Sequence, residues 1–260
     1  MVGTKSIIFA VLLLLLWGAV KNPWERRMEK EIDRVRYGAF QPITRDMRDA
    51  VGQGVALAAL GGFRGLAANV LWFQVTEAWE KCDWARLRSR VEMAVQLQPR
   101  VPFFWEMGAW HLAWNASLAA EGDTALPLFQ RKAEAQQRLE EGQRLLERGV
   151  LLIPESADLW MYLGDLHWQR THDYLKAGYY YEEGSHRWNA PPYAKRLAGF
   201  AYEKSGNDQA AYDYYMRLWN SVKEHPHGPP SYWEAIEKNI QKFEERLNIP
   251  LEKRVGSKVS

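Results

Sequence analysis

The chain is 260 residues long, has a formal net charge of +2 and contains one cysteine, Cys82. This length allows one or two domains with a sizeable core. The near-neutral charge argues against a dedicated nucleic-acid-binding protein, and one cysteine excludes an internal disulfide framework. The 13 Trp, 12 Tyr and 9 Phe are unusual. So many large rings need partners in a core or on a binding surface.

The first twenty residues predict a membrane anchor. Residues 7–20 read IIFAVLLLLLWGAV, a helix of about 21 Å that approaches a full span when it is extended over the preceding residues. Lys5 would then lie at one interface, and Trp17 and Trp24 at the other. A cleaved signal peptide is the alternative, although no register offers the small residues that cleavage needs. We therefore predict a single transmembrane anchor, or signal segment, over residues 1–22.

The charges around this segment bear on its orientation. Lys21, Arg26 and Arg27 outnumber Lys5 plus the amino terminus, and the positive-inside rule would then keep the following domain in the cytoplasm. Short anchors of exported proteins often have the same pattern. We expect the domain on the extracytoplasmic (periplasmic) side, with the cytoplasmic side as the alternative.

Residues 23–46 predict a charged juxtamembrane helix and a linker that contains Pro42. The chain then becomes apolar and rich in small residues. Gly61 and Gly65 have the spacing of a close helix contact, so we predict a buried helix there. A second membrane span is the alternative, which Arg64 in the middle of the run disfavours.

Two patterns of small residues and rings recur further along the chain. In the first, a glycine is followed three residues later by a ring, as in Gly108–His111, Gly164–His167 and Gly199–Tyr202. In the second, small residues flank a large apolar one, as in Gly142–Leu146–Gly149, Ala177–Tyr181–Gly184 and Ala211–Tyr215–Leu218. The first example of the second pattern ends in Pro154, and the other two lack a proline at that place.

These patterns resemble the first and second helices of the tetratricopeptide repeat (TPR), W-x2-L-G-x2-Y and A-x3-F-x2-A-x4-P. The resemblance implies antiparallel helix pairs in which small residues let backbones approach and rings fill the gaps. The implied units are roughly 68–100, 101–155, 156–190 and 191–225. The stretch 61–115 also resembles exported, membrane-anchored bacterial repeat proteins of no known activity.

We therefore predict an all-α fold, an α-solenoid of about four TPR-like helix pairs over residues 47–250. Ser231, with Glu234 at the capping-box position, predicts the start of a closing helix. Residues 251–260 are polar and charged, and we expect them to be disordered.

No motif of a catalytic, metal or nucleotide site occurs in the sequence. Glu183 and His186 have the carboxylate-x-x-His spacing of a bundle metal site, but such sites need two copies. Packing in the repeat's ring position accounts for His111 and His167. We predict no catalytic residue, no metal and no cofactor.

The TPR resemblance also implies a concave groove that is lined by first-helix residues. Mapped onto this sequence, the groove would contain Trp72, Trp79, Trp105, Asp165, Trp168, Tyr193, Arg196 and Phe200. Rigid rings suit the binding of extended or helical peptides, because they lose little entropy on contact. The alternatives are that these rings cover neighbouring helices, or that the register differs by one residue.

The expected function is a membrane-held scaffold that binds a protein or peptide partner, with no nucleic acid, no small-molecule cofactor and no catalysis. One alternative is an exported peptide- or glycan-binding domain with a cleaved signal. Another is a glycan-acting enzyme, which would need two carboxylates that face each other across a cleft. Asp158 and Asp165 lie on a single predicted helix, which disfavours the enzyme.

Overall fold

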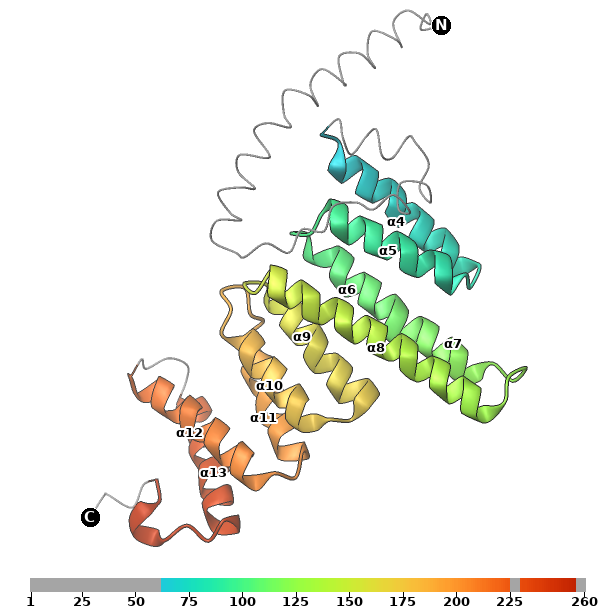
Figure 1. Cartoon of the computed structure of the whole chain (residues 1–260). Coiled ribbons are helices and arrows are strands. Elements are labelled where there is room, and N and C mark those ends of the chain that lie inside the picture. The colour runs from blue at the N-terminus through green and yellow to red at the C-terminus, as the bar shows by residue number, and fades with distance from the viewer. Residues whose placement is uncertain (1–61, 225–229, 256–260) are drawn as a thin grey trace, which may run out of the picture. The chain divides into compact units, whose positions relative to one another are not determined.

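The computed structural model describes residues 62–224 and 230–255 (Figure 1). These residues form two compact units, which divide between Ile153 and Pro154. Every regular element in the two described stretches is a helix, and this confirms the prediction of an all-α fold.

The predicted anchor over residues 1–22 and the predicted juxtamembrane helix and linker over residues 23–46 lie outside the described residues. The same holds for most of the predicted small-residue helix that follows. Among the helices that the structure does describe, none combines the length and the apolar character needed to cross a membrane.

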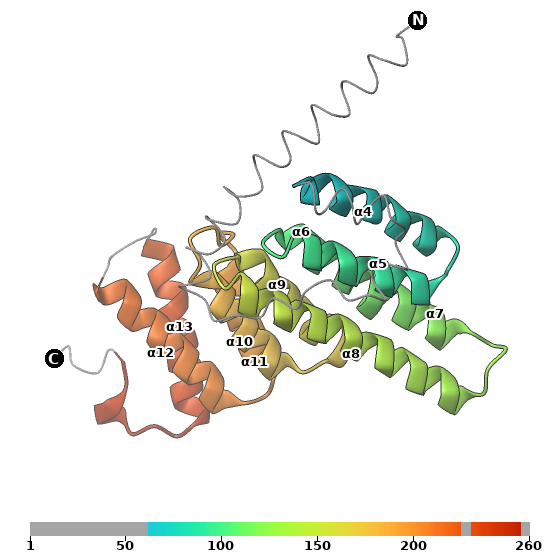
Figure 2. The ribbon, with the colours of Figure 1, turned by 45° about the horizontal axis from the view of Figure 1, so that its top comes forward.

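The first unit pairs two sets of helices. Its elements are α4 (Arg64–Glu80), α5 (Trp84–Leu97), α6 (Pro102–Trp110), the π-helix η1 (His111–Ala116), α7 (Ser117–Gly122) and α8 (Leu128–Leu152). Helix α4 packs on α5, while α6, η1 and α7 form one continuous helical run beside α8 (Figure 2). The long α8 is therefore the partner of three consecutive elements.

The second unit contains two further pairs and a last helix. Its elements are α9 (Ala157–Leu166), the π-helix η2 (His167–Thr171), α10 (Tyr174–Ser185), α11 (Ala194–Lys204), α12 (Asp208–Glu224), α13 (Pro230–Arg246) and the 3-10 helix η3 (Leu251–Lys253). Helix α10 packs on both α9 and α11, and α12 packs on both α11 and α13. Each helix thus lies beside its neighbours in the sequence.

Polar side chains mark where several second helices begin. The carboxylates of Asp83 and Asp173 accept hydrogen bonds from the backbone N–H groups of Arg86 (3.0 Å) and Lys176 (3.1 Å). Such caps satisfy amide groups that have no partner inside the helix. In the turn before α12, Gly206 adopts a φ of +73°, which glycine tolerates without strain.

The two ends of α13 correct two predictions. The helix begins at Pro230, so Ser231 lies in its first turn and is not the cap. The predicted disorder is wrong for residues 251–255, because η3 forms there and the Val255 N–H donates to the buried Glu244 carboxylate at 2.6 Å. This bond folds the tail back onto α13.

Glycines lie where paired helices touch, as the sequence predicts for Gly108, Gly164 and Gly199. A Cβ atom added to Gly108 would lie 2.4 Å from the Val91 side chain, and one added to Gly164 would lie 2.4 Å from the Tyr181 ring. At Gly199 it would lie 2.6 Å from the hydroxyl of Tyr215. At each of these distances the neighbouring side chain would have to shift to admit even an alanine.

The two π-helices begin at equivalent histidines, which the sequence analysis did not foresee. In η1, the His111 Nδ1 atom lies 3.0 Å from the Asn115 amide nitrogen. In η2, the His167 Nδ1 atom lies 3.0 Å from the Thr171 hydroxyl. A π-helical turn admits one extra residue. Both histidines are buried. The position that holds Tyr in the TPR pattern is therefore occupied here by an imidazole with a polar side-chain partner.

Candidate functional site

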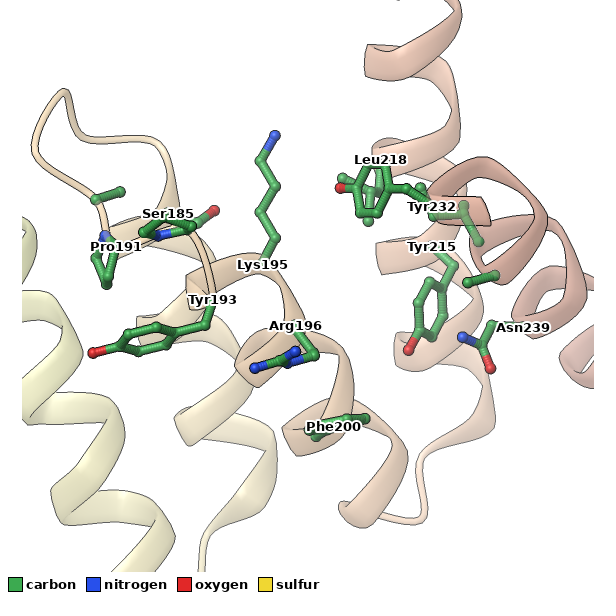
Figure 3. Close-up of a pocket in the computed structure, with 14 residues that line it drawn as sticks. Ser185, Pro191, Tyr193, Lys195, Arg196, Phe200, Tyr215, Leu218, Tyr232 and Asn239 are labelled. Atoms are coloured by element: carbon green, nitrogen blue, oxygen red, sulfur yellow. The ribbon is translucent and has the colours of Figure 1, made fainter. Parts of the chain in front are cut away.

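A groove of about 810 Å³ lies in the second unit, between α11 on one side and α12 and α13 on the other (Figure 3). We call it the α11–α13 groove. Its lining residues are Ser185, Ala190, Pro191, Pro192, Tyr193, Lys195, Arg196, Phe200, Tyr215, Leu218, Tyr232, Ala235, Ile236 and Asn239. This volume lies within the range of known ligand pockets.

Tyr215 of α12 is fixed at the inner surface of the groove. Its hydroxyl donates to the Glu203 Oε1 atom at 2.6 Å, and its ring stacks on Phe243 with the centroids 6.1 Å apart. Burial, and then the Glu203 carboxylate, raise the pKa of Tyr215 above its ordinary value. The phenol therefore stays protonated and acts as a structural donor.

Ion pairs tie α13 to the helices that precede it. Lys242 of α13 contacts the Glu203 carboxylate of α11 at 2.6 Å, and Arg246 contacts Asp208 of α12 at 3.0 Å. Both pairs are partly exposed, so each contributes modestly to stability. Together they join α13 to α11 and to α12, the helices on the two sides of the groove.

A buried carboxylate joins the three helices behind the groove. Glu182 of α10 accepts a hydrogen bond from the Tyr202 hydroxyl of α11 at 2.8 Å. It also accepts two bonds from the Arg217 guanidinium of α12, at 2.8 and 2.7 Å. Burial and the bond to Glu182 raise the pKa of Tyr202. Because every partner is satisfied, this network fixes the relative positions of the helices.

The charge of the groove is one-sided. Among its lining residues only Lys195 and Arg196 are charged, and none is Asp or Glu. Within the described residues, no carboxylate forms an ion pair with either cation. The groove therefore offers apolar and aromatic contact area together with two available positive charges.

Three of the predicted site residues meet in this groove. Tyr193 and Phe200 are 50% and 52% exposed, and the exposed Arg196 lies between them along the chain. Figure 3 draws all three on the α11 side, opposite Tyr215 and Asn239. The first-helix register therefore identifies one wall of the groove.

Trp105 does not belong to a surface, and its assignment to a binding groove is wrong. The side chain is 1% exposed, and its Nε1 donates to the Pro99 carbonyl at 2.9 Å. A Cβ added to Gly149 of α8 would lie 3.1 Å from Trp105, and Arg148 lies 5.3 Å from its ring centroid. The missing side chain at Gly149 is what lets the indole pack onto α8.

Trp72 and Trp79 belong to an aromatic cluster of the first unit. Their ring centroids lie 6.2 and 5.5 Å from that of His111, and Trp72 also contacts Phe103 at 5.1 Å. Burial lowers the pKa of His111 to about 4, so the ring is neutral near pH 7. Trp72 is half-buried and Trp79 is 39% exposed. For Trp72 the structure fits the alternative that rings cover neighbouring helices.

Asp165 and Trp168 lie in the second unit but do not line the groove. Asp165 accepts a hydrogen bond from the Tyr181 hydroxyl at 2.7 Å, and burial raises the pKa of its carboxyl. Trp168 packs edge-on against Tyr174 at 5.1 Å, and the Lys204 ammonium lies 5.2 Å from its ring centroid. Both side chains therefore have intramolecular partners.

The register missed the opposite wall of the groove. Tyr215 and Leu218 come from a second helix, and Tyr232, Ile236 and Asn239 come from α13. The prediction used first helices only, and it treated the last helix as a cap. Treating α13 as the first helix of a further repeat, and applying the same positions to it, could have predicted the groove residues of that helix.

The described residues contain no group of three or more His, Cys, Asp or Glu that could hold a metal ion. Glu183 pairs with Arg187 at 3.1 Å, so its spacing from His186 reflects an ordinary helix surface. In comparisons with known proteins, no protein-family model and no curated protein matches this chain.

Proposed function

We propose that this chain is a membrane-anchored, non-catalytic scaffold of the TPR type that docks a segment of a protein partner in the α11–α13 groove. The observation that carries the proposal is the groove itself. It is lined by half-exposed rings, by two cations and by apolar side chains such as Leu218 and Ile236. The occupant is an extended or helical segment that inserts at least one apolar side chain. Peptide recognition by helical proteins commonly uses such apolar anchors.

The helix pairs support the assignment to this class. Consecutive antiparallel helices pack through glycine at Gly108, Gly164 and Gly199, which is the packing that the TPR resemblance implies. Helical repeat proteins expose long binding surfaces and need no catalytic centre. Fold alone does not give function, and for this reason the proposal depends on the groove rather than on the class.

Site-specific photocrosslinking in cells tests the docking. A photoreactive phenylalanine analogue would replace Tyr193 on one wall or Tyr232 on the other, with the exposed Tyr179 of α10 as the matched control. We expect both wall positions to crosslink to one segment of one partner, as identified by mass spectrometry. That segment, made as a peptide, should bind the full chain about tenfold more weakly after Phe200→Ala, as at a binding hot spot.

Two results would contradict the docking proposal. One is crosslinking from Tyr179 to the same products as from the walls, and the other is the absence of any shared segment. The anchor has its own test, because deletion of residues 1–20 should release the chain from the membrane fraction. Unchanged membrane association would make the anchor wrong. A mature chain that begins after residue 20 would instead support export with a cleaved signal.

A further inference from the structure

We propose that the α11–α13 groove selects an acidic segment, in which acidic side chains pair with Lys195 and with Arg196 while a neighbouring apolar side chain contacts Leu218 and Ile236 on the opposite wall. This inference rests on the proposed function and names the chemistry of its partner. It makes the two cations the specificity-determining residues of the groove.

The first argument is that several other cations near the groove already have partners, whereas Lys195 and Arg196, which line it, have no acidic partner among the described residues. Arg217 is bonded to Glu182, Lys242 to Glu203 and Arg246 to Asp208. The Lys204 ammonium lies 5.2 Å from the ring of Trp168 and 5.0 Å from that of Tyr174. Lys195 and Arg196 are therefore the cations that a ligand can neutralise without breaking a described contact.

The second argument is that the surroundings strengthen an ion pair at this place. Lys195 and Arg196 share the lining of the groove with the apolar side chains of Pro191, Pro192 and Leu218, and no acidic side chain lines it. A bound segment would displace water from this surface and lower the local dielectric, so a carboxylate would be held more strongly than in open solvent. The same field would repel a basic segment.

The third argument concerns the spacing between the cations and the rings. Lys195 and Phe200 are five residues apart on α11, which is about 7.5 Å along the helix axis. That length corresponds to two or three residues of an extended peptide, or to about five residues of a helical one. Figure 3 shows Lys195 extending away from Phe200 along this wall. The bound segment should therefore carry its acidic and apolar residues within one short stretch.

The position of Lys195 is set by the fold. Its backbone carbonyl accepts a hydrogen bond from the buried Tyr214 hydroxyl of α12, so this turn of α11 is fastened to the neighbouring helix. Only the flexible side chain must be ordered on binding. A preorganised backbone reduces the entropic cost of association.

The experiment measures charge preference with synthetic probes. Three fluorescent peptides of one length share the same Leu and Phe positions, and carry Glu, Gln or Lys at the remaining variable positions. Their C-termini are amidated, so that no terminal carboxylate contributes. Fluorescence anisotropy with the full chain in zwitterionic nanodiscs should give a Kd for the Glu peptide about tenfold below that of the Gln peptide, and weaker binding still for the Lys peptide. The preference should shrink as salt screens the charges.

A charge reversal separates a specificity role from a structural one. Lys195→Glu combined with Arg196→Glu should exchange the preference, so that the Lys peptide binds best. The matched control combines Lys132→Glu with Lys253→Glu, which makes the same change in net charge at exposed positions away from the groove lining. The control should keep the preference for Glu. A variant that merely failed to fold would lose binding of all three peptides and could not gain the Lys peptide.

The outcomes distinguish this inference from the proposed function. If both groove walls crosslink to one partner segment, but Glu and Gln peptides bind alike or the reversed variant keeps its preference, the acidic specificity is wrong and the docking stands. If the designed peptides do not bind, the crosslinked partner segment is tested as a peptide with its Glu and Asp residues replaced by Gln and Asn. An unchanged affinity of that peptide would overturn the inference. If the walls share no segment and a fluorescent fatty acid fills the groove, both proposals are wrong.

Discussion

Trp105 in the first unit and Arg196 in the second hold the same place in the repeat register, on the first helix of a pair. Trp105 is buried against α8, whereas Arg196 is exposed on the wall of a groove. The next place along the register repeats the contrast, since Ala109 is buried and Phe200 is half-exposed. Side chains at equivalent positions are therefore buried in the first unit and exposed in the second.

The partner helix explains this contrast. Gly149 of α8, which faces Trp105, and Leu218 of α12 hold the same place in the second-helix pattern. Gly149 lets the Trp105 indole pack onto the backbone, whereas Leu218 has a large side chain at that place and lines the groove. The α9–α10 pair agrees, because Met161 packs on Gly184 and is only 8% exposed. In these three helix pairs, burial of the first-helix side chain thus goes with a glycine at this place on the second helix.

The largest expected effect on stability comes from placing leucine, the residue found at Leu218 of the second unit, at the equivalent Gly149 of the first. Gly149→Leu should displace Trp105, because even a Cβ would lie 3.1 Å from it. Expelling a buried indole should lower the free energy of unfolding by about 3–5 kcal/mol, measured for the full chain by urea titration with circular dichroism. Gly122→Ala is the control, since open space surrounds that position. A loss below about 1 kcal/mol would break the explanation.

A second prediction compares the cost in stability of substituting two glycines, one that faces the backbone of a neighbouring helix and one that faces the end of a side chain. At Gly142 an added Cβ would lie 2.9 Å from the Ala109 carbonyl oxygen and the Ala113 nitrogen. At Gly199 it would lie 2.6 Å from the hydroxyl of Tyr215, which Glu203 holds but which, as the end of a side chain, can shift more than a helix backbone. Gly142→Ala should lower the free energy of unfolding by about 1–3 kcal/mol, and Gly199→Ala by less. Hydrogen exchange should show faster exchange in the first unit for Gly142→Ala and in the second unit for Gly199→Ala. A larger loss of stability for Gly199→Ala than for Gly142→Ala would contradict this explanation.

The buried histidine of the first unit predicts a dependence on pH. Burial lowers the pKa of His111 to about 4, whereas the unfolded chain titrates near 6.5. Between these values the unfolded state binds more protons, so stability falls as pH falls. The slope contributed by one such group approaches about 1.4 kcal/mol per pH unit. Urea titrations across this range should show the slope, and His111→Gln should reduce it. An unchanged slope in the variant would assign it to other groups.

The smallest effect on stability is expected in the groove of the second unit. Arg196→Ala should change the free energy of unfolding by no more than about 0.5 kcal/mol, because the side chain is exposed and unpaired among the described residues. The same variant should nevertheless weaken binding of the acidic peptide severalfold. A large loss of stability without a change in affinity would make Arg196 a structural residue, like Trp105.

The sequence alone determined the features that depend on short spacings. Helical periodicity predicted the all-α class, and the glycine-and-ring patterns marked close contacts such as those at Gly108 and Gly164, because residues three or four apart share one face of a helix. The register on α11 likewise marked Tyr193, Arg196 and Phe200. These predictions need no knowledge of what lies opposite.

Only the tertiary structure decided which of these side chains are available to a partner. Trp105 is buried because Gly149 lies beneath it, and the groove exists because Leu218 of α12 and Ile236 of α13 complete it. These neighbours are distant in sequence. A residue's exposure depends on the volume of whatever packs against it, and packing between separate helices fixes that volume.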